Sequence, residues 1–373
     1  MGERLCLVVT FGTRSDHRSC LSFATMDEIR VAVIPGDGIG QEVVPVAVEA
    51  VRLATQPDHV KLMFDEFPWG CEFYRTQGTM MPADGLERLR QYGAIFLGAV
   101  GDPRIVPDHV SLWGLLIPIR RGFRQSINVR PARFLPGMKS PLREPQNFDI
   151  LVVRENSEGE YSQIGGTIHD APDDMALQVS VFTRRSVERV VRYAFEAADK
   201  RRRHLVSATK SNGIVHTMPF WDSIVTAVAR EYPEVEVESV HLDALLARLV
   251  RAPGSLDVIV GSNLFGDLLT DLAGALMGSI GMAPAANLDP ERQFPSMFEP
   301  VHGSAPDIAG RGIANPIGQL WTGVLMLEHL GLQAAADRLM ASIASVIEDG
   351  PRTPDLGGRA TTREVADAVI ERL

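Results

Sequence analysis

Two carboxylates four residues apart, Asp267 and Asp271, are the clearest candidates for chemistry in this sequence. They follow the strand-like residues 258–262, within Asn263-Leu-Phe-Gly-Asp-Leu-Leu-Thr-Asp271. A spacing of i and i+4 places both on one face of a helix, where they repel each other unless a cation lies between them. Hard oxygen ligands of this kind suit Mg²⁺ or Mn²⁺. The alternative is the attraction of acidic groups to a helix N-terminus, which explains Asp267 better than Asp271.

Three arginines could bind a small dicarboxylate. Arg120 and Arg130 lie within Leu112-Trp-Gly-Leu-Leu-Ile-Pro-Ile-Arg-Arg-Gly-Phe-Arg-Gln-Ser-Ile-Asn-Val-Arg-Pro131, and Arg154 follows in Val153-Arg-Glu-Asn. Guanidinium groups bind carboxylates through paired hydrogen bonds, so converging arginines suit a diacid. For any one arginine alone, a surface salt bridge is the better explanation.

Two glycine-rich segments could contact a nucleotide cofactor. Ile34-Pro-Gly-Asp-Gly-Ile-Gly40 joins a predicted strand to a predicted helix, but Gln41 stands where the dinucleotide fingerprint requires a last glycine. A tight turn that needs positive φ is an equal explanation for it. The polar segment 298–316 is more typical of a functional loop. Its Asp307 could accept hydrogen bonds from a ribose diol and repel a 2′-phosphate.

An alternating strand and helix pattern must position these groups, and it predicts an α/β chain with many parallel strands. A segment rich in Gly, Asp and Pro, residues 163–177, is predicted to project as an arm that could clasp a second subunit. Strands are predicted at 29–34, 94–98, 149–154, 178–183, 204–208, 235–241 and 257–261, and helices at 41–54, 185–200, 218–230 and 267–277.

Length and composition exclude several classes of function. A chain of 373 residues predicts two domains, and a net charge of -10 makes nucleic acid and anionic membranes unfavourable partners. Three cysteines without a CxxC pair exclude a thiolate metal cluster and indicate a reducing compartment. No apolar run approaches the roughly 20 residues that span a bilayer. A cytoplasmic location is therefore expected.

Residues 1–25 are expected to be an unstructured extension, with the natural start at Met26. A strand-like run begins at Ile29, directly after that methionine. The apolar residues 5–11 are followed by Gly12 and Arg14 and lack a convincing cleavage site, which makes them a weak signal peptide.

Taken together, these segments closely resemble the β-decarboxylating hydroxyacid dehydrogenases, the family of isopropylmalate, isocitrate and tartrate/D-malate dehydrogenases. The resemblance covers Ile29 to about Gly331; residues 263–271 match the metal signature and residues 302–307 the adenosine-binding segment. It implies two α/β domains sharing a large mixed sheet, not a true Rossmann fold. Residues 26–125 and 278–373 would form the cofactor-binding domain. Residues 126–277 would carry the metal, the catalytic residues and the dimer interface.

The resemblance also implies a role for each site residue. Tyr161 and Lys210 match the catalytic tyrosine and lysine, and Lys210 with Asp243 would reach the neighbouring subunit's site, which implies a homodimer with shared active sites. The implied cofactors are NAD, Mg²⁺ or Mn²⁺, and a monovalent cation. The implied ligands are Trp113, Leu116, Arg120, Asn128, Arg130 and Arg154 for substrate; Asp243, Asp267 and Asp271 for metal; and Ile39, Glu299, His302, Gly303, Ser304, Ala305, Asp307 and Asn315 for NAD.

The segment before Arg120 limits which substrates are expected. Isopropylmalate enzymes resemble one another in carrying an acidic residue and two leucines there, whereas this chain has Trp113-Gly-Leu-Leu-Ile117. Trp113 fills volume that a branched γ-group would need, and no serine or threonine is present for the γ-carboxylate of isocitrate. Oxidation of D-malate to pyruvate and carbon dioxide, or of tartrate, is therefore expected.

Two alternatives remain open. Leu115 replaces a serine of the tartrate/D-malate pattern, which leaves the exact substrate open, and isopropylmalate dehydrogenase is the alternative enzyme. A non-catalytic regulatory subunit is the alternative of another class. It predicts loss of the acid, base or metal ligands, and Tyr161, Lys210, Asp243, Asp267 and Asp271 are all present.

Overall fold

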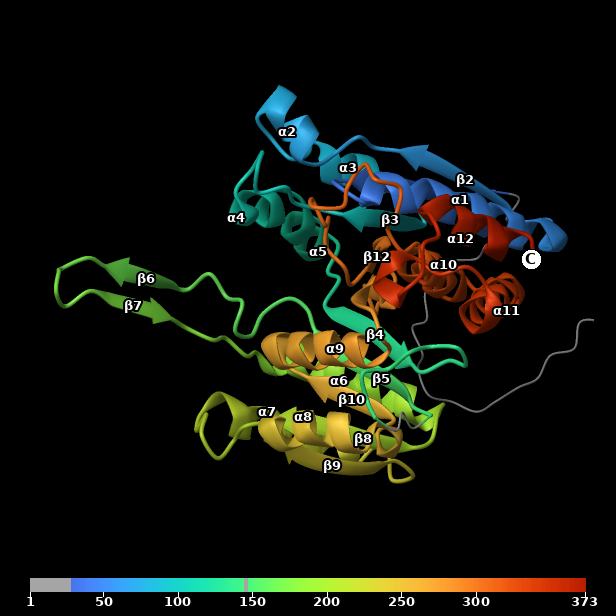
Figure 1. Cartoon of the computed structure of the whole chain (residues 1–373). Helices are drawn as coiled ribbons and strands as arrows, with labels where there is room; N and C mark the ends of the chain where they lie inside the picture. Colours follow the sequence, from blue (N-terminus) through green and yellow to red (C-terminus); the bar gives the residue numbers. More distant parts are fainter. Residues whose placement is uncertain (1–27, 144–146) are drawn as a thin grey trace, which may run out of the picture.

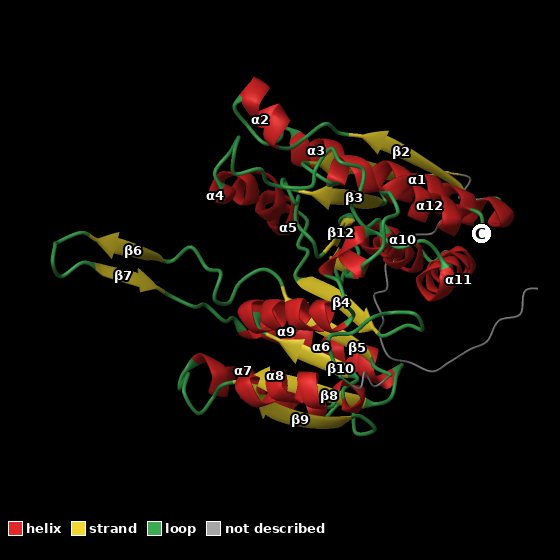
Figure 2. Ribbon diagram, in the orientation of Figure 1, coloured by secondary structure: helices red, strands yellow, loops and turns green. Residues whose placement is uncertain are grey.

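A mixed sheet of ten strands runs through the molecule (Figures 1 and 2), with strand order β2-β1-β3-β12-β11-β4-β5-β10-β8-β9. The computed structural model describes residues 28–143 and 147–373; the predicted extension and the start at Met26 lie outside them. The predicted α/β fold with one large mixed sheet is confirmed. No helix in the described ranges is long and apolar enough to cross a membrane.

The sheet joins two parallel halves through an antiparallel centre. One half contains β1 (Glu28–Gly36), β2 (Lys61–Glu66), β3 (Ala94–Ala99) and β12 (Ser296–Pro300). The other contains β5 (Asp149–Glu155), β8 (His204–Thr209), β9 (Glu236–His241) and β10 (Val258–Gly261). The centre is β11 (Pro284–Leu288) paired with β4 (Ile127–Arg133). Segments distant in sequence therefore meet at the centre, while the exact domain borders stay a prediction.

Helices cover both faces of the first half. Along β1, Val31 and Val33 belong to one core cluster and Ala32 and Ile34 to another, the period of two expected for a strand buried on both sides. The helices packed on the first face are α1 (Gly40–Thr55), α10 (Ile317–His329), α11 (Gln333–Asp349) and α12 (Thr362–Ile370). Those on the second face are α2 (Cys71–Gln77), α3 (Gly85–Leu89), α4 (Asp108–Ser111) and α5 (Ile117–Gly122).

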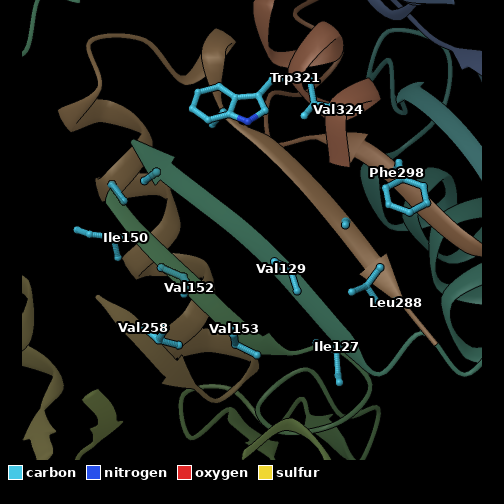
Figure 3. Packing of buried hydrophobic residues seen from close by; sticks show 14 of the residues in the cluster. Ile127, Val129, Ile150, Val152, Val153, Val258, Leu288, Phe298, Trp321 and Val324 are labelled. Atoms are coloured by element: carbon cyan, nitrogen blue, oxygen red, sulfur yellow. The ribbon is translucent and has the colours of Figure 1, made fainter. Parts of the chain in front are cut away.

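The second half carries four helices, α6 (Arg184–Asp199) packed with α7 (Thr217–Ala229), and α8 (Leu242–Arg251) packed with α9 (Asn263–Leu276). Its strands are rich in buried aliphatic residues such as Val152, Val153 and Val258, as expected for strands covered on both faces. Figure 3 shows these side chains beside Val129 of β4 and Leu288 of β11, so the apolar core continues from this half into the centre of the sheet.

The arm is a two-stranded hairpin of β6 (Gly165–Ile168) and β7 (Met175–Gln178) that projects from the body of the molecule (Figure 1). The projecting arm predicted from the sequence is confirmed. The strand predicted at 178–183 is wrong, because beyond Gln178 only Val181 makes a bridge, to Gly159, as the chain returns to α6. Thr183 then caps α6 by accepting a hydrogen bond from the Ser186 amide.

Candidate active site

The helix α9 carries the two carboxylates and is fixed at its first turn. Its cap residue Ser262 accepts a hydrogen bond from the Phe265 amide. The Glu160 carboxylate accepts bonds from Ser262 Oγ at 2.7 Å and from the Leu264 amide at 3.1 Å. The predicted start at residue 267 is four residues late, because the cap lies at Ser262. Asp267 therefore lies in the second turn, where attraction to the helix terminus is weaker.

Arg154, at the end of β5, is held against this helix. Its Nε and Nη2 donate to Asn263 Oδ1 at 3.1 and 2.8 Å, and its Nη1 forms an ion pair with Asp267. A Cβ at Gly266 would lie 2.6 Å from the Cβ of Arg154, so glycine permits this close approach of helix and strand. Tyr161 completes the group by donating from its hydroxyl to Asp267 Oδ2 at 3.1 Å.

Asn128 and Arg130 of β4 extend the site. As residues i and i+2 they share a face of the strand, and Arg130 Nε donates to Asn128 Oδ1 at 2.8 Å. Arg130 Nη1 lies 3.3 Å from Asp267 Oδ1 and 3.6 Å from Asp271 Oδ1. The structure thus brings together two of the predicted arginines, two of the predicted carboxylates and the predicted tyrosine.

Arg120 enters the same site from α5. Its Nη2 lies 2.5 Å from Glu299 Oε1 of β12, in a largely buried ion pair. Burial works to raise the pKa of Glu299, but the charge and hydrogen bond of Arg120 outweigh it and hold that pKa below its ordinary value. Arg120 Nε is buried and has no hydrogen-bond partner among the described residues.

The site is rich in buried positive charge. Burial, and then the charge of Arg130, lower the pKa of Arg154 to about 10. Burial, and then the charge of Arg120, lower the pKa of Arg130, although Asp267 opposes this shift. The charge of Arg120 thus acts on both other guanidinium groups, and Arg130 and Arg154 share the Asp267 carboxylate. A ligand with two carboxylates would compensate that charge.

Asp267 and Asp271 supply hard oxygen ligands that fit a divalent cation. Burial, and then the negative charge of Asp267, raise the pKa of Asp271, so a cation between them would relieve a real repulsion. The third predicted ligand, Asp243, lies elsewhere and receives a hydrogen bond from Lys210 Nζ at 2.8 Å. Within the described parts of this chain, no three acidic, histidine or cysteine side chains are grouped to hold a metal.

The residues predicted to set substrate specificity lie before α5. Residues 112–116 form one turn of π-helix, a rare local structure that is frequent at functional sites. This turn buries Leu115 completely and leaves Trp113 and Leu116 half-buried. The Arg121 guanidinium lies over the Trp113 ring, 5.0 Å from its centroid, and therefore holds that ring in place.

The two glycine-rich segments meet. The Ile39 amide donates to Ser304 O at 2.9 Å, and a Cβ at Gly38 would lie 2.0 Å from that oxygen. Gly38 has a φ of +54°, so the tight-turn explanation is correct for this residue. Below this contact Ile39 packs with Ala305 in a small apolar cluster. The glycine turn thus supports the loop at Ser304 and Ala305.

The remaining predicted cofactor residues lie on or near this loop, although residues 298–300 belong to β12 and not to the loop predicted at 298–316. His302 is buried, its Nε2 has no partner in the described part of the chain, and burial lowers its pKa. Gly303 and Asp307 are exposed, and Gly303 has open space at its Cβ position. Asn315 Nδ2 donates to Asp355 Oδ2 at 2.9 Å, and its Oδ1 accepts a bond at 3.0 Å from the amide of Ile317, the first residue of α10.

Several residues of the site were given no role of their own from the sequence. Thr270 Oγ1 accepts a bond from Arg130 Nη1 at 2.8 Å, and Asn263 and Glu160 fix α9. Asn287 lies on β11, a strand that the sequence pattern did not predict. These roles depend on contacts between distant segments, so spacing along the chain gives no indication of them.

Comparison with known proteins identifies what the chain resembles. Residues 30–369 match the isocitrate/isopropylmalate dehydrogenase family, beyond Gly331 where the resemblance was expected to end. The chain is 54% identical over 350 residues to a probable tartrate dehydrogenase/decarboxylase of Bacillus subtilis, covering 94% of this chain and 99% of the relative. It is 51% identical over 356 residues to a decarboxylating D-malate dehydrogenase of Escherichia coli, covering 93% and 99%. An isocitrate dehydrogenase structure from Methylococcus capsulatus aligns with a TM-score of 0.84 and 34% identity, covering 92% of this chain and 99% of the other.

Proposed function

Because this chain belongs to the isocitrate/isopropylmalate dehydrogenase family and is an oxidoreductase, we propose that it oxidises D-malate or tartrate with NAD as hydride acceptor. For D-malate the products would be pyruvate and carbon dioxide. One observation carries the proposal: Arg130, Arg154 and the Tyr161 hydroxyl all contact the single carboxylate of Asp267. Anion-binding groups, a metal-type ligand and a proton donor thus lie within reach of one small substrate.

The arginines would bind the substrate carboxylates. Arg120, Arg130 and Arg154 are all largely buried, so their attraction for an anion is only weakly screened. In this structure the positive charges of these arginines are partly neutralised by Glu299 and Asp267. A diacid that enters with a divalent cation would keep these charges balanced. The cation would pair with Asp267, and the guanidinium groups would pair with the substrate carboxylates.

Asp267 and Asp271 would hold the divalent cation together with Asp243 of a second subunit. A bound Mg²⁺ or Mn²⁺ would make the substrate hydroxyl more acidic and would stabilise negative charge on its oxygen. The two aspartates on one helix face provide ligands of the correct type and leave positions open for substrate oxygens.

Two residues would divide the proton transfers between them. Lys210 accepts the hydroxyl proton while the C2–H electron pair leaves with its hydrogen as hydride to the nicotinamide. The C3–carboxylate bond then breaks, carbon dioxide leaves, and the electron pair of that bond forms the enolate of pyruvate. Tyr161 donates a proton to C3, and burial followed by the charge of Asp267 raises its pKa, so the hydroxyl stays protonated at neutral pH.

A homodimer with shared active sites would complete the site. In a single chain Lys210 is bound to Asp243, and neither is joined by a hydrogen bond or ion pair to Asp267 within the described residues. Exposed apolar side chains lie where a partner could cover them, on α9 at Leu268 and on the arm at Ile168 and Leu177. The arm would then clasp the second subunit.

The cofactor site would favour NAD. Residues 302–307 would bind the adenosine half together with Ile39 and Asn315; Ile39 and Ala305 share an apolar cluster, and the buried His302 Nε2 has no partner among the described residues. Asp307 would accept hydrogen bonds from the ribose diol and repel the 2′-phosphate of NADP. Glu299 joins this half of the site to Arg120.

A substrate panel tests the proposal. NADH formation would be measured with Mn²⁺ for D-malate, L-tartrate, meso-tartrate, isopropylmalate and isocitrate. We expect D-malate or a tartrate to give the highest kcat/KM, because Trp113 fills the space that a branched γ-group would need. Highest activity with isopropylmalate would replace the substrate assignment, and no activity with any diacid would indicate a regulatory subunit. Replacing K⁺ by tetramethylammonium in the same assay tests the monovalent cation.

A further inference from the structure

Asn287 lies at the centre of the sheet, on β11, and is wholly buried at 0% exposure. Its side chain uses its full hydrogen-bonding capacity. Oδ1 accepts from Asn128 Nδ2 at 3.0 Å and from Asn156 Nδ2 at 2.9 Å. Nδ2 donates to Glu299 Oε1 at 2.7 Å and to Met297 O at 3.5 Å. Two donors on one side and a carboxylate on the other fix which way the amide points.

Two chains of hydrogen bonds lead from this amide to substrate-binding arginines. On one side the amide donates to Glu299 Oε1, the oxygen that also binds Arg120 Nη2 at 2.5 Å. On the other side it accepts from Asn128, whose own Oδ1 accepts from Arg130 Nε at 2.8 Å. One side chain of β11 thus connects an arginine of α5 with an arginine of β4, although it lies more than 150 residues after both in the sequence.

We propose that Asn287 is a positioning residue that sets the separation of Arg120 and Arg130, and with it the fit of a dicarboxylate. The inference rests on the proposed function, in which these arginines hold the substrate carboxylates. A long guanidinium side chain loses much rotamer freedom when it binds, unless its orientation is already fixed. Asn287 fixes both orientations before the substrate arrives. A buried, low-dielectric network of this kind is strong when complete and costly when one member is lost.

Asn156 provides a matched control. It is also buried, and its Nδ2 donates to Asn287 Oδ1 and to Gln125 O, both at 2.9 Å. Removing it breaks two buried hydrogen bonds but leaves intact both paths from Asn287 to the arginines. Asn156→Ala should therefore destabilise the protein as a purely structural substitution does, with no specific effect on the two arginines.

The experiment compares binding without turnover. Titration calorimetry with succinate, a dicarboxylate that has no hydroxyl to oxidise, would be done in the presence of Mn²⁺ on the unmodified protein, Asn287→Ala and Asn156→Ala. We expect Asn287→Ala to raise the Kd at least about 10-fold, with a similar rise in KM for the active diacid and a smaller change in kcat. Asn156→Ala should keep the Kd within about 2-fold, even where its melting temperature falls equally. Equal Kd changes in the two variants would overturn the proposal.

Two further variants keep the test decisive. If Asn287→Ala does not fold, Asn287→Ser keeps one short donor and acceptor at this position and should show the same Kd change in weaker form. Arg130→Lys tests the premise separately, because it removes the fork that binds a carboxylate. If Arg130→Lys leaves succinate binding unchanged, the proposed substrate site is wrong. If Arg130→Lys weakens binding and neither Asn287 variant does, only the positioning role is wrong.

Discussion

The hydroxyl of Tyr161 donates a hydrogen bond over 3.1 Å to Oδ2 of Asp267, and Oδ1 of the same carboxylate is paired with Arg154 and Arg130. One aspartate therefore contacts the proposed general acid and two of the proposed substrate ligands. In the proposed function Asp267 would bind a cation, and Tyr161 would then be free to turn toward the substrate. The proposed base, Lys210, does not belong to this group of contacts, so the roles of acid and base can be tested separately.

Tyr161→Phe should slow net turnover of D-malate by about 10²- to 10⁴-fold, the usual cost of removing a general acid. Hydride transfer precedes the step that needs this proton, so a single turnover should still form NADH. Arg154 lies 5.8 Å from the Tyr161 ring centroid, and phenylalanine keeps that contact, which limits the structural change. Stopped-flow absorbance at the NADH band is the measurement. Turnover at the unmodified rate would show that Tyr161 is not the acid.

Asp271→Asn should make the metal-free protein slightly more stable and remove most of its stabilisation by Mn²⁺. Burial and Asp267 raise the folded pKa of Asp271, so its ionisation opposes folding. That contribution favours the fold below the unfolded pKa and is lost as the pH rises through the raised folded pKa. The side chain is 55% exposed, so the effect on the metal-free protein is small.

The metal effect is larger and is read from melting curves with and without Mn²⁺. At a concentration of 100 times Kd, a bound ion stabilises the unmodified protein by about 2.7 kcal/mol. Asp271→Asn should lose most of this gain at the same Mn²⁺ concentration. Asp349→Asn is a control on an exposed acid of α11 and should keep the full gain. Retention of the gain by Asp271→Asn would remove Asp271 from the metal site.

Asp307→Lys should move the cofactor preference from NAD toward NADP. The Asp307 side chain is exposed and not buried, so salt screens its repulsion of a 2′-phosphate, and we expect a change of about 10- to 100-fold in the ratio of kcat/KM values. Asp307→Asn removes the charge without reversing it. Its ratio of kcat/KM values should lie between those of the unmodified enzyme and Asp307→Lys. The ratio is measured at low and moderate ionic strength. An unmodified enzyme that uses both cofactors equally would contradict the role given to Asp307.

The sequence predicted the fold class well because its signals are local. The β-branched runs at residues 149–154 and 204–208 and the amphipathic helix at 185–200 have patterns that short windows contain, and they were placed within two residues. The strands β4 and β11 were missed. Each contains polar residues, Asn128 and Asn287, that are buried only because other strands supply their partners. A window along the chain cannot contain those partners.

The sequence indicated which main residues belong to the candidate site, but not which residues contact and support them. Residue type and spacing indicated Arg154 and Asp267, resemblance to a family added Tyr161, and the structure brings these three into contact. The supporting residues Glu160 and Asn287 act through contacts more than 10 residues away in sequence, as the pairs of Glu160 with Leu264 and Asn287 with Glu299 show. The third metal ligand stays a prediction, because it requires a second chain.

A mixed dimer tests the shared site. Lys210→Met and Asp267→Asn should each inactivate the homodimer, since one removes the base and the other a metal ligand. In a heterodimer one site would receive both intact residues and the other neither, so up to about half of the unmodified activity per dimer should return. Two different affinity tags allow purification of the heterodimer. No recovery in a verified heterodimer would show that Lys210 and Asp267 serve the same site from one chain.

Oxidative decarboxylation itself is tested most directly with D-malate labelled with ¹³C at the β-carboxylate. NADH would be followed by absorbance and labelled carbon dioxide by mass spectrometry, with Mn²⁺ present and after its removal by EDTA. We expect one labelled carbon dioxide for each NADH, and neither product without the metal. Formation of NADH without labelled carbon dioxide, with oxaloacetate accumulating instead, would contradict the decarboxylation step. Formation of both products without any divalent metal would contradict the roles of Asp267 and Asp271.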